Sequence, residues 1–281
     1  MHDDEDVANH FSKRILRVQM AKRNLRKSKN RSEIQRGGAN TAPGNPWLFG
    51  LHAVTAALLN ENRRVERLVV TSAGHERLPE AALETIRAEF LGREDMDALL
   101  PPGAVHQGAA VLCAPLPVPA LEDVLLEASD QTVMVVLDQV TDPQNVGAIM
   151  RSAAAFGASA LVMQDRHAPP ITGALAKAAS GAVDNLPLVR VTNLARALDD
   201  LKAAQFWCIG LDGESETALQ DFKADGRVAL VMGAEDTGLR RLTAESCDAL
   251  ARLPTSDAFG TLNVSAAAAA ALYEWARRQN S

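Results

Sequence analysis

The 281-residue sequence is poor in cysteine and contains no long apolar run. Its three cysteines, Cys113, Cys208 and Cys247, are far apart and form no CxxC or Cys/His pattern, which argues against disulfides and a zinc site. The six histidines share no metal-ligand spacing either. No uninterrupted apolar run approaches the roughly 18 to 20 residues of a membrane-spanning helix. We therefore expect a cytoplasmic protein with neither a metal site nor a membrane anchor.

The sequence also lacks a glycine fingerprint for dinucleotides. Residues 133–140, "VMVVLDQV", are typical of a buried strand, and "DPQNVGAIMRSAAAFGA" at 142–158 follows as a polar turn and a helix of small residues. Strand, turn and helix in this order resemble a phosphate-binding loop, yet the glycine pattern of such loops is missing. The absence removes most of the support for a nicotinamide-dependent dehydrogenase.

Charge is unevenly distributed along the chain. The formal net charge is −6. Residues 1–46 hold ten basic and five acidic residues, which leaves 19 basic against 30 acidic residues in the rest of the chain. All ten basic residues fall between Lys13 and Arg36. Such a cluster can bind a polyanion, because each phosphate contact releases condensed counterions. The alternative is a solvated tail that only favours solubility.

Composition divides the chain into four parts. Residues 1–46 form the basic tail, which ends in the Gly/Pro/Asn linker "GGANTAPGNP". Residues 47–115 predict a small α/β unit with a helix at 52–60, a strand at 66–72, a helix at 79–90 and a terminal strand within 104–116. Residues 116–130 continue a proline-containing connector.

Residues 131–281 predict alternating strands and helices, which favours a mainly parallel sheet with helices on both faces. The expected strands lie at 133–138, 160–163, 186–190, 206–210 and 228–232, and the expected helices at 145–156, 172–180, 194–203 and 264–278.

Ligands of parallel α/β sheets collect at the carboxyl ends of the strands, and three polar segments follow predicted strands here. In the first, Asn145 could cap the helix. Arg151 lies about 200° around the helix from Ile149 and so faces away from the apolar stripe that Ile149 forms with Ala153 and Phe156. On pattern alone, a solvated arginine accounts for Arg151.

The second segment, "ALVMGAEDTGLRR" at 229–241, places Gly233 and Glu235 directly after a strand. The third, "ARLPTSDAFGTLNVSAAAAAALYEWA" at 251–276, has a loop before the last helix, which Asn263 or Ser265 could cap. Taken singly, these segments also fit a surface turn and a helix cap.

Together, in this order and spacing, the three segments resemble the motifs of the SpoU or TrmH family of RNA ribose 2′-O-methyltransferases, within the SPOUT superfamily. The resemblance covers residues 131–278. The part from "FGLHAVTAALL" to "GAVHQG" looks like the substrate-binding domain of the subgroup that methylates a guanosine of large-subunit ribosomal RNA. Only the basic tail then lies outside the resemblance.

The resemblance implies a sheet threaded into a trefoil knot, an exception to the rule that folds are unknotted. It implies S-adenosylmethionine as the cofactor, contacted by Gly233, Leu253 and Leu262 mainly through backbone groups. It also implies that a ribose 2′-hydroxyl attacks the methyl group, and that Arg151 lies near this hydroxyl to orient and activate it.

By the same resemblance, Asn145, Glu235 and Asn263 orient Arg151 and the ribose through hydrogen bonds. Thr261 stands where relatives commonly have serine and keeps the hydroxyl, and the bulky Phe259 departs from the expected loop of small residues. Members of the family are homodimers in which the arginine of one subunit completes the site of the other.

The substrate is the least determined part of this interpretation. The separate unit at 47–115 favours ribosomal RNA, and transfer RNA is the alternative, since relatives with the same motifs methylate it. A catalytically inactive RNA-binding relative is a further alternative, which the intact Asn145, Arg151, Glu235 and Asn263 disfavour.

Overall fold

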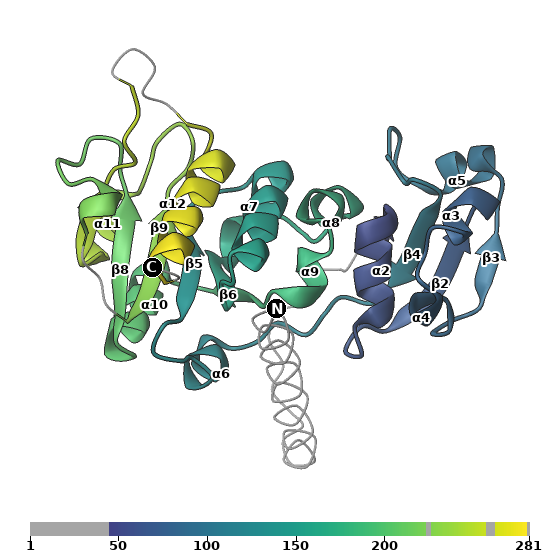
Figure 1. Ribbon diagram of the computed structural model, residues 1–281, viewed down its shortest axis with the longest axis horizontal. Coiled ribbons are helices and arrows are strands. Elements are labelled where there is room, and N and C mark those ends of the chain that lie inside the picture. The colour runs from purple at the N-terminus through teal and green to yellow at the C-terminus, as the bar shows by residue number, and fades with distance from the viewer. Residues whose placement is uncertain (1–44, 223–225, 257–261, 280–281) are drawn as a thin grey trace, which may run out of the picture. The chain divides into compact units, whose positions relative to one another are not determined.

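The computed structural model describes residues 45–222, 226–256 and 262–279 (Figure 1). Two sheets are present in this part of the chain. The basic segment from Lys13 to Arg36, Phe259 and Thr261 lie outside the described residues.

The first sheet has four strands in the order β1-β4-β2-β3. β1 and β2 pair antiparallel to β4, and β3 pairs parallel to β2. The strands are β1 (Trp47–Phe49), β2 (Val65–Val70), β3 (Ala88–Phe90) and β4 (Ala109–Cys113), and the helices are α2 (Leu51–Leu59), α3 (Ser72–His75), α4 (Glu80–Leu83) and α5 (Arg93–Leu99).

The predicted helix at 79–90 is wrong over most of its length. Only α4 is helical, and residues 88–90 form the edge strand β3, with Ala88 opposite Leu68 of β2. The β-branched Thr85 follows α4, and its hydroxyl donates to the carbonyl of Ala82 at 2.7 Å. A Thr hydroxyl that bonds to a nearby carbonyl competes with continued helix, and pairing with β2 then decides the structure of 88–90.

The second sheet has six strands in the order β10-β8-β9-β5-β6-β7, all parallel. This confirms the predicted parallel α/β class. The strands are β5 (Val133–Leu137), β6 (Ala160–Gln164), β7 (Leu188–Val191), β8 (Phe206–Leu211), β9 (Arg227–Met232) and β10 (Ala249–Ala251). The helices are α6 (Leu121–Leu126), α7 (Pro143–Ala155), α8 (Gly173–Ala179), α9 (Ala182–Asn185), α10 (Leu194–Ala203), α11 (Arg241–Ser246) and α12 (Val264–Gln279), with short 3₁₀ turns η1 (Asp165–His167) and η2 (Leu219–Asp221).

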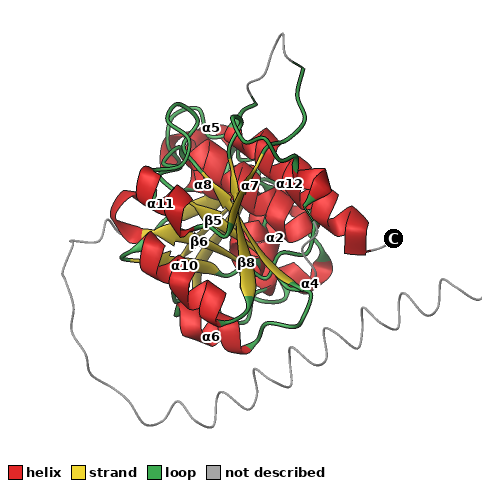
Figure 2. Ribbon diagram, turned by 90° about the vertical axis from the view of Figure 1, so that its left-hand side faces the viewer, coloured by secondary structure: helices red, strands yellow, loops and turns green. Residues whose placement is uncertain are grey.

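Helices cover both faces of this sheet (Figure 2). Successive side chains of β5 point to opposite faces of the sheet and so pack into two different cores. Val133, Val135 and Leu137 pack with α7, α8 and α12. Met134 and Val136 pack with α6 and α10. The knot implied by the resemblance stays a prediction, because strand order and register do not describe how the chain is threaded.

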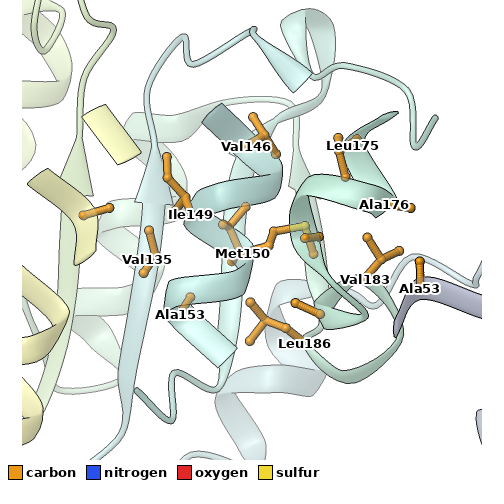
Figure 3. Close-up of a cluster of buried hydrophobic side chains, with 14 of the residues drawn as sticks. Ala53, Val135, Val146, Ile149, Met150, Ala153, Leu175, Ala176, Val183 and Leu186 are labelled. Atoms are coloured by element: carbon orange, nitrogen blue, oxygen red, sulfur yellow. The ribbon is translucent and has the colours of Figure 1, made fainter. Parts of the chain in front are cut away.

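Helix α7 packs closely against α8 (Figure 3). A Cβ at Gly147 would lie 2.6 Å from the carbonyl oxygen of Leu175 and 2.7 Å from the Cβ of Ala178. Ile149 and Ala153 are fully buried as the sequence predicts. Phe156 is only partly buried and meets Tyr273 of α12 edge to face. The close packing fixes the position of α7, which carries the first of the three motifs.

The turn between α2 and β2 is joined to α9 by a buried ion pair. Arg63 Nε lies 2.8 Å from Asp184 Oδ1, and the two side chains are 1% and 2% exposed. Asn60 donates to the same carboxylate at 3.1 Å, and Arg63 also donates to the carbonyl of Ala114. Because each charged group has close polar partners, this contact compensates part of the cost of burial.

No helix in the described part of the chain is long and apolar enough to cross a membrane.

Candidate functional site

The three motifs meet at the carboxyl edge of the six-stranded sheet. β5 and β9 are neighbours in the sheet, and the main-chain N–H of Asp138, directly after β5, donates to the carbonyl of Met232 at 2.8 Å. Parallel strands place all their carboxyl ends at one edge, so the segments after β5, β9 and β10 emerge there together. This is the arrangement that the sequence predicts for the three motifs.

Helix α7 begins with a cap from Asp142. Its carboxylate accepts from the N–H groups of Gln144 at 3.1 Å and Asn145 at 3.4 Å, and Pro143 occupies the first helical turn. Asn145 therefore does not cap the helix, which corrects the capping role that the sequence allowed for this residue. Its amide remains available for contacts with the other motifs.

Asn145, Glu235 and Asn263 form one hydrogen-bonded cluster. Asn263 Nδ2 donates to Asn145 Oδ1 at 3.1 Å and to Glu235 Oε2 at 3.2 Å, and Asn145 Nδ2 donates to the same carboxylate oxygen at 3.4 Å. An ionised carboxylate only accepts, so two amide donors suit it. The fold thus brings together three residues that lie as far as 118 positions apart in the sequence.

The orientation of the Asn263 amide follows from its other contacts. Its Oδ1 accepts from the main-chain N–H of Ser265 at 2.9 Å and from the Ser265 hydroxyl at 2.6 Å. Asn263 therefore caps α12 with its oxygen and directs its nitrogen to Asn145 and Glu235. Asn263 thus caps α12, as the sequence allows, and also belongs to the cluster. Ser265 does not cap the helix but donates to the Asn263 side chain.

Arg151 lies on α7 six residues after Asn145, or about 9 Å further along the helix axis. Its side chain is exposed, as the periodicity predicts. Within the described residues it has no hydrogen bond or ion pair, so the structure does not join Arg151 to Asn145, Glu235 or Asn263.

Gly233 begins a tight loop after β9. Ala234 and Gly238 exchange main-chain hydrogen bonds of 3.1 and 2.9 Å, and Gly238 has a φ of +63°. A Cβ at Gly233 would lie 2.1 Å from the carbonyl carbon of Gly238. Only glycine allows this approach, so the loop itself requires a residue without a side chain at position 233.

The residues expected to contact a cofactor have unused backbone groups. Leu253 is partly buried against the core, and Leu262 is 46% exposed. The main-chain N–H and C=O groups of Gly233, Leu253 and Leu262 make no hydrogen bond to another described main-chain group. Free backbone donors and acceptors beside an exposed apolar side chain fit a cofactor that carries a polar nucleoside and an aliphatic chain.

Sequence reasoning missed an ion pair at the same edge. Asp138 is fully buried, and Arg240 Nη2 lies 2.6 Å from its Oδ1. A carboxylate at the end of an otherwise apolar strand is the signal that could have identified Asp138, because such a group needs a buried partner.

The described residues contain no group of three or more His, Cys, Asp or Glu side chains placed to hold a metal ion. The three cysteines are free thiols. Burial raises the pKa of Cys113 to about 11 and the pKa values of Cys208 and Cys247 to about 12, so all three stay protonated and unreactive at neutral pH.

Comparison with protein families gives two matches. Residues 132–273 match the SpoU rRNA Methylase family, and residues 47–119 match the RNA 2′-O ribose methyltransferase substrate binding family. The first match contains the first two motifs and residues 251–273 of the third, and the second match contains the four-stranded sheet.

Two curated relatives align over most of the chain. The 23S rRNA (guanosine-2′-O-)-methyltransferase RlmB of Xylella fastidiosa is 38% identical over 243 residues, which cover 84% of this chain and 97% of that protein. The protein of the same name from Photobacterium profundum is 37% identical and covers 84% of this chain and 98% of its own length.

Solved structures show the same fold. The SpoU methyltransferase AviRb from Streptomyces viridochromogenes, in complex with the cofactor AdoMet, superimposes with a TM-score of 0.70 at 25% identity, covering 85% of this chain and 91% of its own. An AdoMet-bound rRNA methyltransferase from Sinorhizobium meliloti gives a TM-score of 0.68 at 23% identity, covering 84% and 87%. With its three motifs assembled at one sheet edge and matched along most of its length, the chain belongs to the SpoU rRNA methylase family.

Proposed function

We propose that the protein transfers the methyl group of S-adenosylmethionine to a ribose 2′-hydroxyl of a guanosine in large-subunit ribosomal RNA. The hydrogen-bonded cluster of Asn145, Glu235 and Asn263 carries this proposal, because it joins one polar residue from each family motif at the edge where such sheets bind ligands. The two relatives that align over more than 80% of the chain are named for this reaction.

Bound S-adenosylmethionine supplies a methyl group already activated on a sulfonium, so the protein needs only to position the hydroxyl and help remove its proton. Gly233, Leu253 and Leu262 would hold the cofactor through main-chain groups that make no hydrogen bond to another described main-chain group. The exposed side chain of Leu262 would cover its apolar part.

Arg151 orients the hydroxyl in this proposal. A guanidinium stays protonated in proteins, so it acts as a donor that stabilises charge on the ribose oxygen while the proton of the hydroxyl passes to solvent water. Asn145, Glu235 and Asn263 hold the ribose, and the family motif assigns Thr261, which lies outside the described residues, to the same catalytic set. Each of these roles follows the family motifs residue by residue.

We also propose a homodimer in which Arg151 of one subunit completes the site of the other. Two observations support this arrangement. Arg151 is exposed and has no partner among the described residues of its own chain, and it lies about 9 Å along α7 from Asn145. An arginine that serves a neighbouring subunit needs both the exposure and the separation.

We propose a division of labour in which 47–115 binds RNA, 116–130 connects and 131–281 catalyses. The basic tail at 1–46 then adds affinity for phosphates. It offsets the charge of the rest of the chain, which carries 30 acidic against 19 basic residues. A ribosomal RNA substrate also supports a cytoplasmic location, which we include in the proposal. Deleting residues 1–36 should weaken RNA binding and flatten its salt dependence, and an unchanged salt slope would make the tail a bystander.

The reaction is tested by incubating the protein with labelled S-adenosylmethionine and, in separate reactions, with undermethylated ribosomal RNA and with transfer RNA. Label in a 2′-O-methylguanosine of large-subunit RNA is the expected result. Label in transfer RNA alone would replace the substrate and keep the chemistry. Binding of RNA without any label would indicate an inactive relative and overturn the proposal.

A further inference from the structure

The buried carboxylate of Asp138 lies at the carboxyl ends of the parallel strands, but Asp138 is not one of the residues that the family motifs assign to the site. Its Oδ2 accepts from the main-chain N–H of Arg240 at 2.9 Å, and its Oδ1 accepts from Arg240 Nε at 2.7 Å. Asp138 is 0% exposed, whereas the Arg240 side chain is 42% exposed. The carboxylate thus fixes both the backbone and the guanidinium of one residue.

These contacts anchor one end of the loop that carries Glu235. The loop leaves β9 at Gly233 and closes on itself through the paired Ala234 and Gly238. It then reaches Arg240, where Asp138 at the end of β5 holds it. Because β5 and β9 are adjacent strands, the loop spans them, and Glu235 lies between the two anchored ends. The position of its carboxylate relative to Asn145 therefore depends on the Asp138–Arg240 pair.

The same guanidinium bonds to Gln164, which in turn bonds to the residue after the next strand. Arg240 Nη2 donates to Gln164 Oε1 at 3.0 Å, and Gln164 Nε2 donates to the carbonyl of Thr192 at 3.2 Å. Gln164 ends β6, and Thr192 directly follows β7. The Arg240 side chain thus links the ends of β5 and β6 to the loop after β9, and Gln164 extends the link to the end of β7.

A buried ion pair is poor evidence for stability alone, because apolar residues of the same volume avoid the cost of desolvation. The neighbouring residue provides the contrast. Arg241 pairs with Glu245 one turn along α11, and both of these side chains are more than half exposed. Of these two adjacent arginines, only Arg240 joins the loop that carries Glu235 to the sheet.

We propose that Asp138 and Arg240 are positioning residues, which hold Glu235 in hydrogen-bonding register with Asn145 and Asn263. The inference rests on the proposed methyl transfer for its kinetic consequence. The anchoring of the Glu235 loop by the Arg240 side chain can be measured without that reaction.

The test compares Arg240→Lys with Arg241→Lys in the full chain. Lysine keeps the charge beside Asp138 but cannot bond to the carboxylate and Gln164 with a planar fork. We expect kcat for methyl transfer to fall roughly tenfold to a hundredfold in Arg240→Lys, since small displacements at a site have effects of that size. KM for RNA should change little, and Arg241→Lys should match the wild type.

Hydrogen exchange supplies the readout that does not need activity. The amides of Ala234, Gly238 and Arg240 should exchange roughly ten times faster in Arg240→Lys, because their protection depends on the anchored loop. Amides of β5 and β9 should keep their wild-type protection. The double variant Asp138→Asn/Arg240→Gln removes both charges together, so it should fold, and it should show the same faster exchange.

Two results would overturn the proposal. One is wild-type kcat together with wild-type loop exchange in both Arg240→Lys and the double variant. The other is faster exchange throughout β5 and β9, which would make the pair a general support of the fold. If the wild type methylates no RNA, the proposed function fails by itself, while local exchange of the loop still decides whether Asp138 and Arg240 hold it.

Discussion

The two sheets bury similar apolar side chains but differ in where their polar groups gather. In the four-stranded sheet with mixed directions, the buried His106 accepts from the N–H of Gly108 and meets Asp97 nine residues away. In the six-stranded parallel sheet, Asn145, Glu235 and Asn263 come from segments up to 118 residues apart. A parallel sheet brings the carboxyl ends of all its strands to the same side, so loops from distant motifs can form one site there. A sheet with mixed strand directions does not gather its carboxyl ends in this way.

Removal of Arg151 should give the largest effect. Arg151→Ala should lower the rate of methyl transfer by about 10²- to 10⁴-fold, the range for loss of a group that assists proton transfer. The melting temperature and the affinity for S-adenosylmethionine should stay near wild type, because the side chain is exposed.

Arg67→Ala is the matched control for that prediction. Arg67 lies on the mixed sheet in an exposed pair with Glu89. If both variants lose activity equally, the contrast between the two sheets does not hold, and a wild-type rate in Arg151→Ala would remove Arg151 from the mechanism.

The buried ion pair of Arg63 should affect stability. Arg63→Ala leaves Asp184 buried and unpaired, which should lower the free energy of unfolding by about 3 to 5 kcal/mol. Arg67→Ala, which disrupts an exposed pair, should leave the free energy of unfolding almost unchanged. Urea unfolding measures both, and equal losses would contradict the assigned difference in burial.

Gly147 tests the support of the first motif. Gly147→Ala forces α7 away from α8, because its Cβ would meet the carbonyl oxygen of Leu175 at 2.6 Å, and the expected loss is about 1 to 3 kcal/mol. Gly213→Ala is the control, since no atom lies within 4 Å of its Cβ. Unfolding curves that coincide for the two variants would show that α7 and α8 can move apart without any loss in the free energy of unfolding.

The smallest effect concerns pH and the last helix. Hydrogen bonds from Arg277 and Arg278 lower the pKa of Glu274 below its ordinary value of 4.5. A lowered folded-state pKa contributes stability above that value, and the contribution is lost as pH falls through the folded-state pKa. The stability difference between wild type and Glu274→Gln should therefore be constant from pH 6 to 8 and narrow below about pH 4.5. A difference that widens on acidification would contradict this sign.

The sequence predicts the regular elements of the parallel sheet well, because their apolar periods agree with their burial. It fails where pairing decides the structure, as at 88–90, which form β3 instead of a helix, and at β10, whose three residues "ALA" have no strand signature. The roles of Asn145 and Asp142 at the start of α7 could not be separated either. Both residues can cap a helix, and only the observed hydrogen bonds distinguish them.

The Asp138–Arg240 pair was beyond sequence reasoning for a related reason. The two residues are 102 positions apart, and although the carboxylate of Asp138 at the end of an apolar strand indicates a need for a partner, no local pattern identifies Arg240 as that partner. Their meeting depends on the adjacency of β5 and β9, which strand order determines and local pattern does not.

The cluster of Asn145, Glu235 and Asn263 also has a consequence for folding. Its members follow β5, β9 and β10 in chain order, so the cluster is complete only when α12 has packed against α7. Native contacts of such high sequence separation slow folding, because the ends of a long loop must meet before the contact can form. Helix α12 also buries Val264, Leu272 and Trp275 in the core that faces α7, so the docking of one helix completes both this core and the polar cluster. Molecules without a docked α12 have no assembled site with which to act on RNA.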